Sequence, residues 1–363
     1  MTDTEHLVRH IEQRLQRPLQ PAIRQAFLHI PREEFVSQYY QKRENGLSWK
    51  LVPASTQQVY QDHVLVTAID DKERPFSSSS QPSVMALQLE ALEIQPGQRI
   101  LEIGTGTGYN AALLGFLVGA GGQVISIDIQ EGLIEVAKRR LSTTGNISVL
   151  YGDGFAGCRE YVPYDRILAT CGVRQVPQAW TDQLQSSGRL ICNLHTNLTS
   201  IFLCADKCPS GRLEGRLLDI DASYMLMHTG SYQPGKPLDW SAYEALPQRH
   251  VQFAEPVDVL LKSPAFCLQL QALVPGIFKK YHGNREAIYL YLLTDEVAMR
   301  VDGDSLLFFG DQQADIEQKI KQCVQLYRAS GRLPISEYRF SLDGDCLHFS
   351  VAGKAFQLCL QNE

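Results

Sequence analysis

Long apolar runs are absent from this chain of 363 residues. No stretch approaches the ~20 consecutive apolar residues that a membrane-spanning helix needs. The first residues, MTDTEHLVRHIEQ, are polar and charged, so they do not have the pattern of a signal peptide. These absences predict a soluble, cytoplasmic protein with no membrane partner.

An excess of positive charge is also missing. The chain has 34 Lys and Arg against 40 Asp and Glu, which gives a net charge of −6 and a pI of about 5.9. A surface that binds nucleic acid needs clustered Lys and Arg to contact phosphates. The charge balance therefore predicts that nucleic acid is not a partner.

The cysteines form neither a disulfide framework nor a metal-ligand pattern. Nine cysteines are scattered through the chain, and Cys171, Cys192, Cys267 and Cys359 stand in apolar stretches, as reduced core thiols do. The one close pair, in CADKC, lacks two further ligands at a suitable spacing, so no metal is predicted. The isolated histidines are interpreted as structural.

What the chain does contain is an alternation of apolar strand-like and helix-like segments. Such repeated β-α units predict an α/β fold with a doubly wound parallel sheet. Because the chain exceeds the length of one typical domain, we expect two domains. The predicted strands are residues 100–104, 124–129, 147–152, 166–170 and 189–194, the predicted helices are 109–118, 131–141 and 176–184, and a turn is predicted at 186–189.

A glycine-rich turn follows the first of these strands. In doubly wound sheets, ligands bind beyond the carboxyl ends of the strands, where this turn lies. Its pattern is Gly104-x-Gly106-x-Gly108, whereas the dinucleotide fingerprint would need a third glycine where Tyr109 stands. A pyrophosphate is therefore not the favoured ligand. Glu102, expected at the mouth of the turn, would repel phosphates and attract an ammonium or a sulfonium.

Two more acids stand at the ends of the next two strands. Asp128 can accept hydrogen bonds from both hydroxyls of a ribose. Asp153, in a Gly-Asp-Gly turn, can meet the amino group of an adenine. Each acid alone could cap the following helix, but three acids at three successive strand ends are hard to explain in that way.

This combination resembles the class I methyltransferases that use S-adenosylmethionine and release S-adenosylhomocysteine. The resemblance implies that the cofactor lies on the segments that follow the three strands. The residues that it assigns to cofactor binding are Glu102, Gly104, Thr105, Gly106, Thr107, Gly108, Asn110, Asp128, Ile129, Asp153 and Gly154.

A second set of motifs surrounds the glycine turn in a fixed order over about residues 20–195. It comprises AIRQAFLHIPREEFV, SSSQP, YGDGFAG, PYDRILAT and QVPQAWTDQLQSSGRLI. The set resembles the protein-L-isoaspartate O-methyltransferases, although Ser78 and Ser79 replace that family's threonine and apolar residue. The resemblance implies a carboxyl O-methyltransferase that acts on a peptide or protein carrying Asp or isoAsp.

The resemblance to this family also assigns a function to the serine run. Ser78, Ser79 and Ser80 are assigned to the substrate, with Ser80 as the catalytic residue whose hydroxyl donates to the substrate carboxyl. Without the resemblance, Ser77–Ser80 would be interpreted as a flexible polar loop before the helix at Ser83. A carboxylate, with a pKa of ~3.9, is already ionised at neutral pH and needs no general base. Its methyl ester can close to a succinimide.

The chain continues well beyond the last of these motifs. The expected organisation is an N-terminal segment over 1–80, the cofactor-binding core over 81–230, a linker over 231–240 and an α+β domain over 241–363. In the last domain, antiparallel strands with an Asp-Gly-Asp turn are followed by a helix over 315–333 that presents Ile316, Ile320, Cys323 and Tyr327 on one face.

This C-terminal region resembles the extra domains of isoaspartyl-methyltransferase-like enzymes that modify ribosomally made peptides. Tailoring of such a peptide is therefore the favoured context, because a dedicated enzyme needs contacts away from the reacting carboxyl. General isoaspartyl repair and methylation of a small molecule remain as alternatives. Against a DNA amino-methyltransferase, Ala169-Thr170-Cys171-Gly172 stands where an Asn/Asp-Pro-Pro-aromatic tetrad is expected. The intact acids argue against a binding module without activity, and the oligomeric state stays open.

Overall fold

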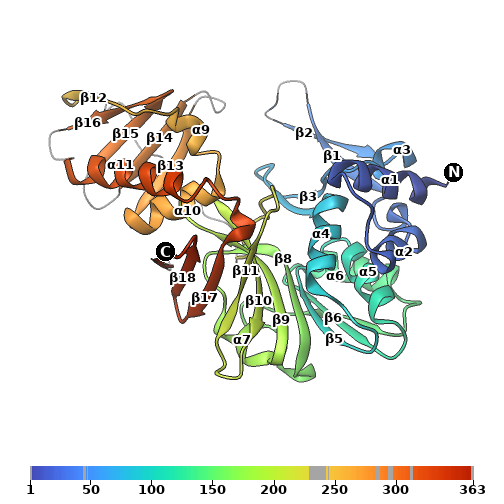
Figure 1. The fold of residues 1–363 in the computed structure, drawn as a ribbon. Helices are drawn as coiled ribbons and strands as arrows, with labels where there is room; N and C mark the ends of the chain where they lie inside the picture. The colour runs from blue at the N-terminus through green and yellow to red at the C-terminus, as the bar shows by residue number, and fades with distance from the viewer. Residues whose placement is uncertain are drawn as a thin grey trace.

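In the part of the chain that it describes, the computed structural model contains three sheets (Figure 1). It describes residues 2–43, 46, 48–228, 243, 245–282, 287–292, 297–310 and 314–360. The expected linker over 231–240 lies outside these residues. No helix in this part of the chain is long and apolar enough to cross a membrane. The same residues contain no group of three or more His, Cys, Asp or Glu side chains that could hold a metal ion.

The largest sheet has ten strands in the order β19-β18-β17-β11-β10-β9-β8-β5-β6-β7. Its parallel half consists of the last five strands in this order, which confirms the predicted parallel α/β sheet. These strands are β5 (Arg99–Ile103), β6 (Gln123–Asp128), β7 (Ile147–Tyr151), β8 (Tyr164–Val173) and β9 (Leu184–His195).

Helices cover both faces of the parallel half, so alternate strand residues enter two separate cores. On one face lie α4 (Pro82–Leu92), α5 (Tyr109–Val118) and α6 (Glu131–Arg140), together with α1 (Asp3–Leu15) and α2 (Pro21–His29). On the other face, α7 (Gln178–Gln183) contributes Trp180, which is fully buried. Burial on both faces explains why the central parts of these strands are rich in apolar residues.

The turn predicted at 186–189 is wrong. These residues lie within β9, where the register with β8 jumps from Tyr164↔Leu184 to Arg166↔Arg189. The extra residues of β9 form a bulge, and Ser187 has a φ of 64°. The sequence Ser-Ser-Gly has turn-forming residues, but a bulge uses the same backbone conformation without ending the strand.

The antiparallel half of the large sheet unites two distant parts of the chain. After β10 (Ser200–Lys207) and β11 (Leu213–Leu218) come three strands from the C-terminal end. These are β17 (Arg339–Asp343), β18 (Cys346–Val351) and β19 (Lys354–Cys359), and β11 pairs with β17. The expected C-terminal region is thus divided between this sheet and a separate one. Cys359, expected in the core, is exposed on the edge strand opposite Cys346.

A five-stranded antiparallel sheet carries the rest of the C-terminal region (Figure 1). The predicted Asp-Gly-Asp turn joins two of its strands at Gly303, and the buried face of α11 includes Ile316, Ile320, Cys323 and Tyr327, as predicted. Helix α11 ends at Ala329 rather than at residue 333. The elements are β12 (Gln248–Gln252), α9 (Val257–Leu260), α10 (Pro264–Leu273), β13 (Ile277–His282), β14 (Ala287–Leu292), β15 (Val297–Asp302), β16 (Ser305–Phe309), α11 (Ala314–Ala329) and the short η3 (Ile335–Glu337).

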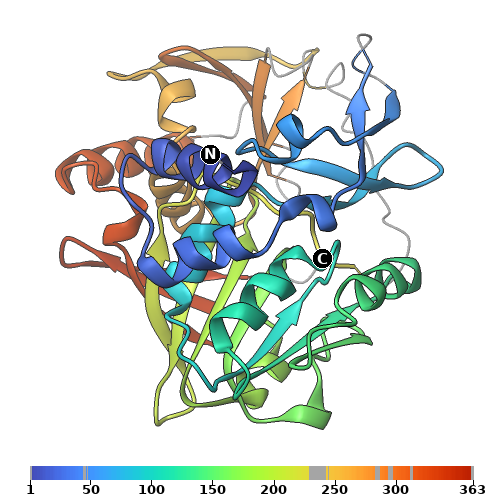
Figure 2. The same ribbon diagram turned by 90° about the vertical axis from the view of Figure 1, so that its right-hand side faces the viewer.

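The N-terminal region forms a four-stranded sheet in the order β2-β1-β3-β4. Its strands are β1 (Gln38–Lys42), β2 (Trp49–Pro53), β3 (Leu65–Ile69) and β4 (Pro75–Ser79), and η1 (Arg32–Glu34) and α3 (Thr56–Val59) accompany them. Figures 1 and 2 show this sheet and the five-stranded sheet at the same end of the ten-stranded sheet. Most of the serine run is thus strand rather than flexible loop.

Candidate active site

The glycine turn after β5 has a backbone that only glycine adopts easily. Gly104, Gly106 and Gly108 have φ values of 100°, 51° and 85°. A Cβ at Gly104 would lie 2.6 Å from the hydroxyl oxygen of Thr170, which donates a hydrogen bond to the Gly104 carbonyl at 2.7 Å. The turn is therefore tightly packed, and its backbone lies at the carboxyl end of β5.

Asp128, at the end of β6, is tied directly to this turn. One carboxylate oxygen accepts a hydrogen bond from the Gly106 amide at 3.0 Å, and the other accepts from the Gln130 amide at 3.0 Å. Each oxygen keeps a lone pair for a ligand hydroxyl. Ile129 follows Asp128 directly and is half-buried. Asp128 thus offers two hydrogen-bond acceptors, as the two hydroxyls of a ribose require.

The sequence led us to expect Glu102 at the mouth of the turn, but the structure places it elsewhere. It is fully buried, because alternate side chains of β5 point into the core that α5 covers. Its carboxylate accepts hydrogen bonds from the Asn110 amide at 2.7 Å and the Ser126 hydroxyl at 2.5 Å. Burial raises the pKa of Glu102 to about 7. Its place in the structure is to hold Asn110 and Ser126 beneath the turn.

The two threonines of the turn also direct their side chains inward. The hydroxyls of Thr105 and Ser126 lie 2.7 Å apart, and the Thr107 hydroxyl accepts a hydrogen bond from the Tyr109 amide at 3.3 Å. Both threonine side chains are buried. A ligand at this turn would therefore meet their backbone rather than their hydroxyls.

Asp153 follows β7, the strand next to β6 in the sheet. Its side chain is exposed, and one oxygen accepts a hydrogen bond from the Phe155 amide at 2.9 Å. Gly154 is enclosed, because a Cβ there would lie 2.4 Å from the Met227 sulfur. The order β5-β6-β7 brings the three predicted segments to one edge of the sheet, as the sequence predicted.

The serine motif lies against the same turn. A Cβ at Gly106 would lie 3.7 Å from both the Ser77 hydroxyl oxygen and the Ser78 carbonyl oxygen. Ser78 and Ser80 are half-buried, but Ser79 is buried and its hydroxyl accepts a hydrogen bond from Arg32 at 3.1 Å. Alternation along β4 thus turns the Ser79 side chain inward, so the predicted contact of Ser79 with substrate would have to use its backbone.

Arg32, to which the sequence analysis gave no role, fixes the serine motif by hydrogen bonds from the protein interior. Its guanidinium is fully buried and donates to the carbonyls of Ser79 and Ser80 at 3.2 and 3.0 Å. It also donates to the carbonyls of Val59, Gln61 and His63 at 3.0, 3.2 and 3.2 Å. Burial lowers the pKa of Arg32 to about 10, so it stays charged at neutral pH. The motif IPREEFV contained this arginine, but nothing in the motif showed that it is buried.

Tyr224 reaches the site from a segment that follows β11. Its amide donates to the Asn193 side-chain oxygen at 3.0 Å, and its phenol donates to the Gln88 side-chain oxygen. Burial raises the pKa of this phenol, and a hydrogen bond with Ser80 opposes the rise. Tyr224 lies too far from the serine motif in the sequence for any local pattern to have indicated this contact.

Comparison with known proteins identifies the family. The model "Protein-L-isoaspartate(D-aspartate) O-methyltransferase (PCMT)" matches residues 2–219, more than half of the chain. The chain belongs to this family. Its fold is that of the class I, S-adenosylmethionine-dependent methyltransferases, which confirms the predicted fold and cofactor class.

Individual relatives extend this finding. A protein-L-isoaspartate O-methyltransferase of Thermotoga maritima is 42% identical over 179 residues, which are 49% of this chain and 51% of that relative. The match thus spans about half the length of the relative. A solved structure named protein-L-isoaspartate O-methyltransferase matches 96% of this chain and 99% of its own, with 26% identity and a TM-score of 0.57.

A second solved structure supports the fold alone. It is a putative protein-L-isoaspartate O-methyltransferase from Plasmodium falciparum in complex with S-adenosyl-L-homocysteine. The match covers 63% of this chain and all of that chain, with 14% identity and a TM-score of 0.50.

Proposed function

We propose that this chain transfers a methyl group from S-adenosylmethionine to the side-chain carboxylate of an isoaspartyl residue in a peptide or protein. The observation that carries the proposal is that the serine motif lies next to Gly106, within reach of the position that a Cβ there would occupy. Because of this arrangement, the serine motif, which would bind a carboxylate, lies next to the glycine turn, which would bind an adenosine cofactor. Membership of the family supports the same reaction.

The residues at the edge of the sheet fit this cofactor. Asp128 would hold the ribose hydroxyls with its remaining lone pairs, and the exposed carboxylate of Asp153 would accept from the adenine amino group. When bound, S-adenosylmethionine supplies an electrophilic methyl group on a sulfonium. The positive φ values of Gly104, Gly106 and Gly108 shape the tight turn whose backbone would face the cofactor.

The serine motif would position the nucleophile. A side-chain carboxylate is ionised at neutral pH, so the site needs orientation rather than a general base. The Ser80 hydroxyl would donate to one carboxylate oxygen and leave the other free to react. Arg32 holds the Ser80 carbonyl and so fixes the backbone at this residue. The Ser80 hydroxyl has one proton, which it directs to Tyr224 in the free protein, so the hydroxyl would turn from Tyr224 to the carboxylate when the substrate binds.

Isoaspartyl peptides are a better-supported substrate class than one dedicated precursor peptide. The C-terminal region first favoured tailoring of a ribosomally made peptide. However, a solved chain named protein-L-isoaspartate O-methyltransferase matches 96% of this chain, so a region of this kind also occurs there. Its presence alone therefore does not favour tailoring.

Mass spectrometry of three substrates tests the proposal. The full chain would be incubated with S-adenosylmethionine and an isoaspartyl peptide, its aspartyl twin or a ribosomally made precursor peptide. We expect the isoaspartyl peptide to gain one methyl group and the aspartyl twin to remain unmodified. Methylation of the precursor at an ordinary aspartate, with no reaction of the isoaspartyl peptide, would instead establish tailoring.

A further inference from the structure

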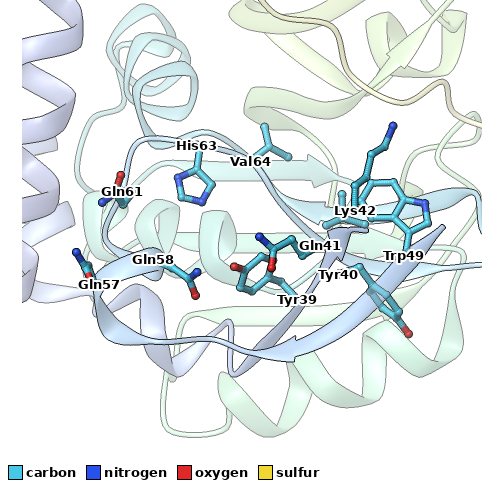
Figure 3. Close-up of a pocket in the computed structure, with 11 residues that line it drawn as sticks. Tyr39, Tyr40, Gln41, Lys42, Trp49, Gln57, Gln58, Gln61, His63 and Val64 are labelled. Carbon is cyan, nitrogen blue, oxygen red and sulfur yellow. The ribbon is translucent and has the colours of Figure 1, made fainter. Parts of the chain in front are cut away.

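A groove of about 650 Å³ lies on the N-terminal sheet (Figure 3). A volume of this size can hold several side chains of a ligand. The β1–β2 hairpin contributes aromatic and basic side chains, while amide side chains come from α3 and the residues that follow it. The lining residues used below are Tyr40, Lys42, Trp49, Gln61, His63 and Val66.

Strand register connects this groove to the serine motif. Tyr40 on β1 is paired with Val66 on β3, and Val66 is paired with Ser78 on β4. Partners in an antiparallel sheet place their side chains on the same face. Tyr40, Val66 and Ser78 therefore form one row from the hairpin to the motif that would hold the substrate carboxyl.

Arg32 also connects the groove to the serine motif through its hydrogen bonds. The guanidinium that holds the Ser80 carbonyl also holds the carbonyls of Gln61 and His63, which line the groove. The groove and the serine motif are thus fixed relative to each other by one buried side chain.

The spacing of the strands gives the distance between the groove and the serine motif, and hence the number of substrate residues between them. Neighbouring strands are ~4.8 Å apart, so β1 and β2 lie ~10 and ~14 Å from β4. An extended peptide covers ~3.3 Å per residue. Side chains about three or four residues from the methylated residue would therefore reach Tyr40, Lys42 and Trp49.

The charge of the groove indicates which side chain it would accept. Among its described lining residues, Lys42 is the one with a permanent charge, and burial together with Arg32 lowers the pKa of His63, which favours its neutral form. The Lys42 ammonium lies 5.4 Å from the centre of the Trp49 ring. This pair offers a cation next to an aromatic surface, which favours an acidic side chain over a basic one.

We propose, on the basis of the function proposed above, that this groove binds the substrate peptide about three or four residues from the isoaspartyl residue and prefers an acidic side chain there. The groove is a specificity site, separate from the atoms that react. It would make the enzyme methylate some damaged sequences faster than others.

A matched set of isoaspartyl peptides tests this proposal. Each short peptide would carry Glu, Gln or Lys three or four positions from the isoaspartyl residue, on its N-terminal or its C-terminal side. In one of the two series, we expect kcat/KM for the Glu peptide to exceed that for the Lys peptide by roughly three- to tenfold. The difference should lie in KM, because the groove contacts are the same in the ground state and the transition state.

Charge reversal in the hairpin supplies the decisive variants. Lys42→Glu should invert the preference between the Glu and Lys peptides. Lys50→Glu is the matched control, because Lys50 is exposed on the same hairpin and does not line the groove, so the preference should persist. Equal rates for all peptides, or a preference that survives Lys42→Glu, would overturn the proposal. If no isoaspartyl peptide were methylated, the proposed function itself would fail.

Discussion

The two halves of the ten-stranded sheet differ in what their strand ends carry. In the parallel half, β5, β6 and β7 end at the same edge. Gly104–Gly108 follow β5, Asp128 is the last residue of β6, and Asp153 follows β7. In the antiparallel half, neighbouring strands run in opposite directions, so successive loops alternate between the two edges. The candidate site accordingly gathers at one edge of the parallel half.

The antiparallel half has a different role: it connects the C-terminal region to the sheet. It joins β11 to β17 and so ties the end of the chain to the sheet that carries the site. Its side chains enter the same core as Trp180 and the helices of the C-terminal region. We therefore propose that the parallel half holds the cofactor and that the antiparallel half contributes mainly to stability. Variants in each half should separate these two effects.

The largest effect is expected from Arg32→Met, which acts under the serine motif. This change leaves buried carbonyls without a donor and should lower the free energy of unfolding by about 3–5 kcal/mol, measured by urea denaturation. Arg32→Lys should recover little, because an ammonium cannot reproduce the planar fork of donors. Arg24→Met, at an exposed ion pair with Glu12, should cost less than about 1 kcal/mol. Equal losses for Arg32→Met and Arg24→Met would contradict the assigned role.

Phe349→Ala tests the antiparallel half. Phe349 is 2% exposed and contacts the rings of Tyr338 and Phe356. Its removal should cost about 3 kcal/mol, at the lower end for a buried Phe because β18 lies one strand from the sheet edge. Calorimetry should show unchanged affinity for S-adenosylmethionine. A tenfold loss of affinity in a folded variant would show that this half also shapes the cofactor site.

Asp128→Ala tests the parallel half. The change removes the acceptors for the Gly106 and Gln130 amides and for the ribose, so cofactor affinity should fall by about 1–3 kcal/mol in titration calorimetry. Asp165→Ala is the control, because Asp165 lies near the opposite end of the parallel strands and accepts from the Arg99 amide. Unchanged affinity in Asp128→Ala would remove the ribose assignment.

A smaller, pH-dependent effect is expected from Glu102→Gln. The pKa of Glu102 rises from 4.5 in the unfolded chain to about 7 in the fold, so the folded state binds this proton more tightly. The stability that this group contributes is complete below about pH 4.5 and is lost as the pH rises through about 7. Between about pH 5 and pH 7, wild type should therefore lose no more than about 2 kcal/mol relative to Glu102→Gln. Parallel stability curves for the two proteins would show that Glu102 is ionised throughout.

The parallel half could be predicted from the sequence because its signals are local. Apolar strands, a glycine turn and acids at strand ends each occupy a few consecutive residues, and the α/β rules place the strand ends together. The antiparallel half could not be predicted in this way. The pairing of β11 with β17 brings together segments far apart in the chain, and neither segment contains a pattern that names its partner.

Within the site, the sequence indicated residues more reliably than the direction of their side chains. Serines have a low strand propensity, yet pairing with β3 and the hydrogen bonds of Arg32 make Pro75–Ser79 a strand. That strand turns Ser79 inward and leaves Ser78 and Ser80 on the other side. Glu102 was expected at the mouth of the glycine turn because it stands two residues before Gly104, but alternation along β5 places it beneath α5.

The central claim is that the parallel half holds the cofactor while the serine motif holds the reacting carboxylate. Ser80→Ala tests it most directly, with cofactor affinity measured by calorimetry and methyl transfer to an isoaspartyl peptide measured in a single turnover. The account predicts unchanged cofactor affinity and a transfer rate that is roughly ten- to a thousandfold lower, because one positioning hydrogen bond is lost. A transfer rate equal to that of wild type would contradict it.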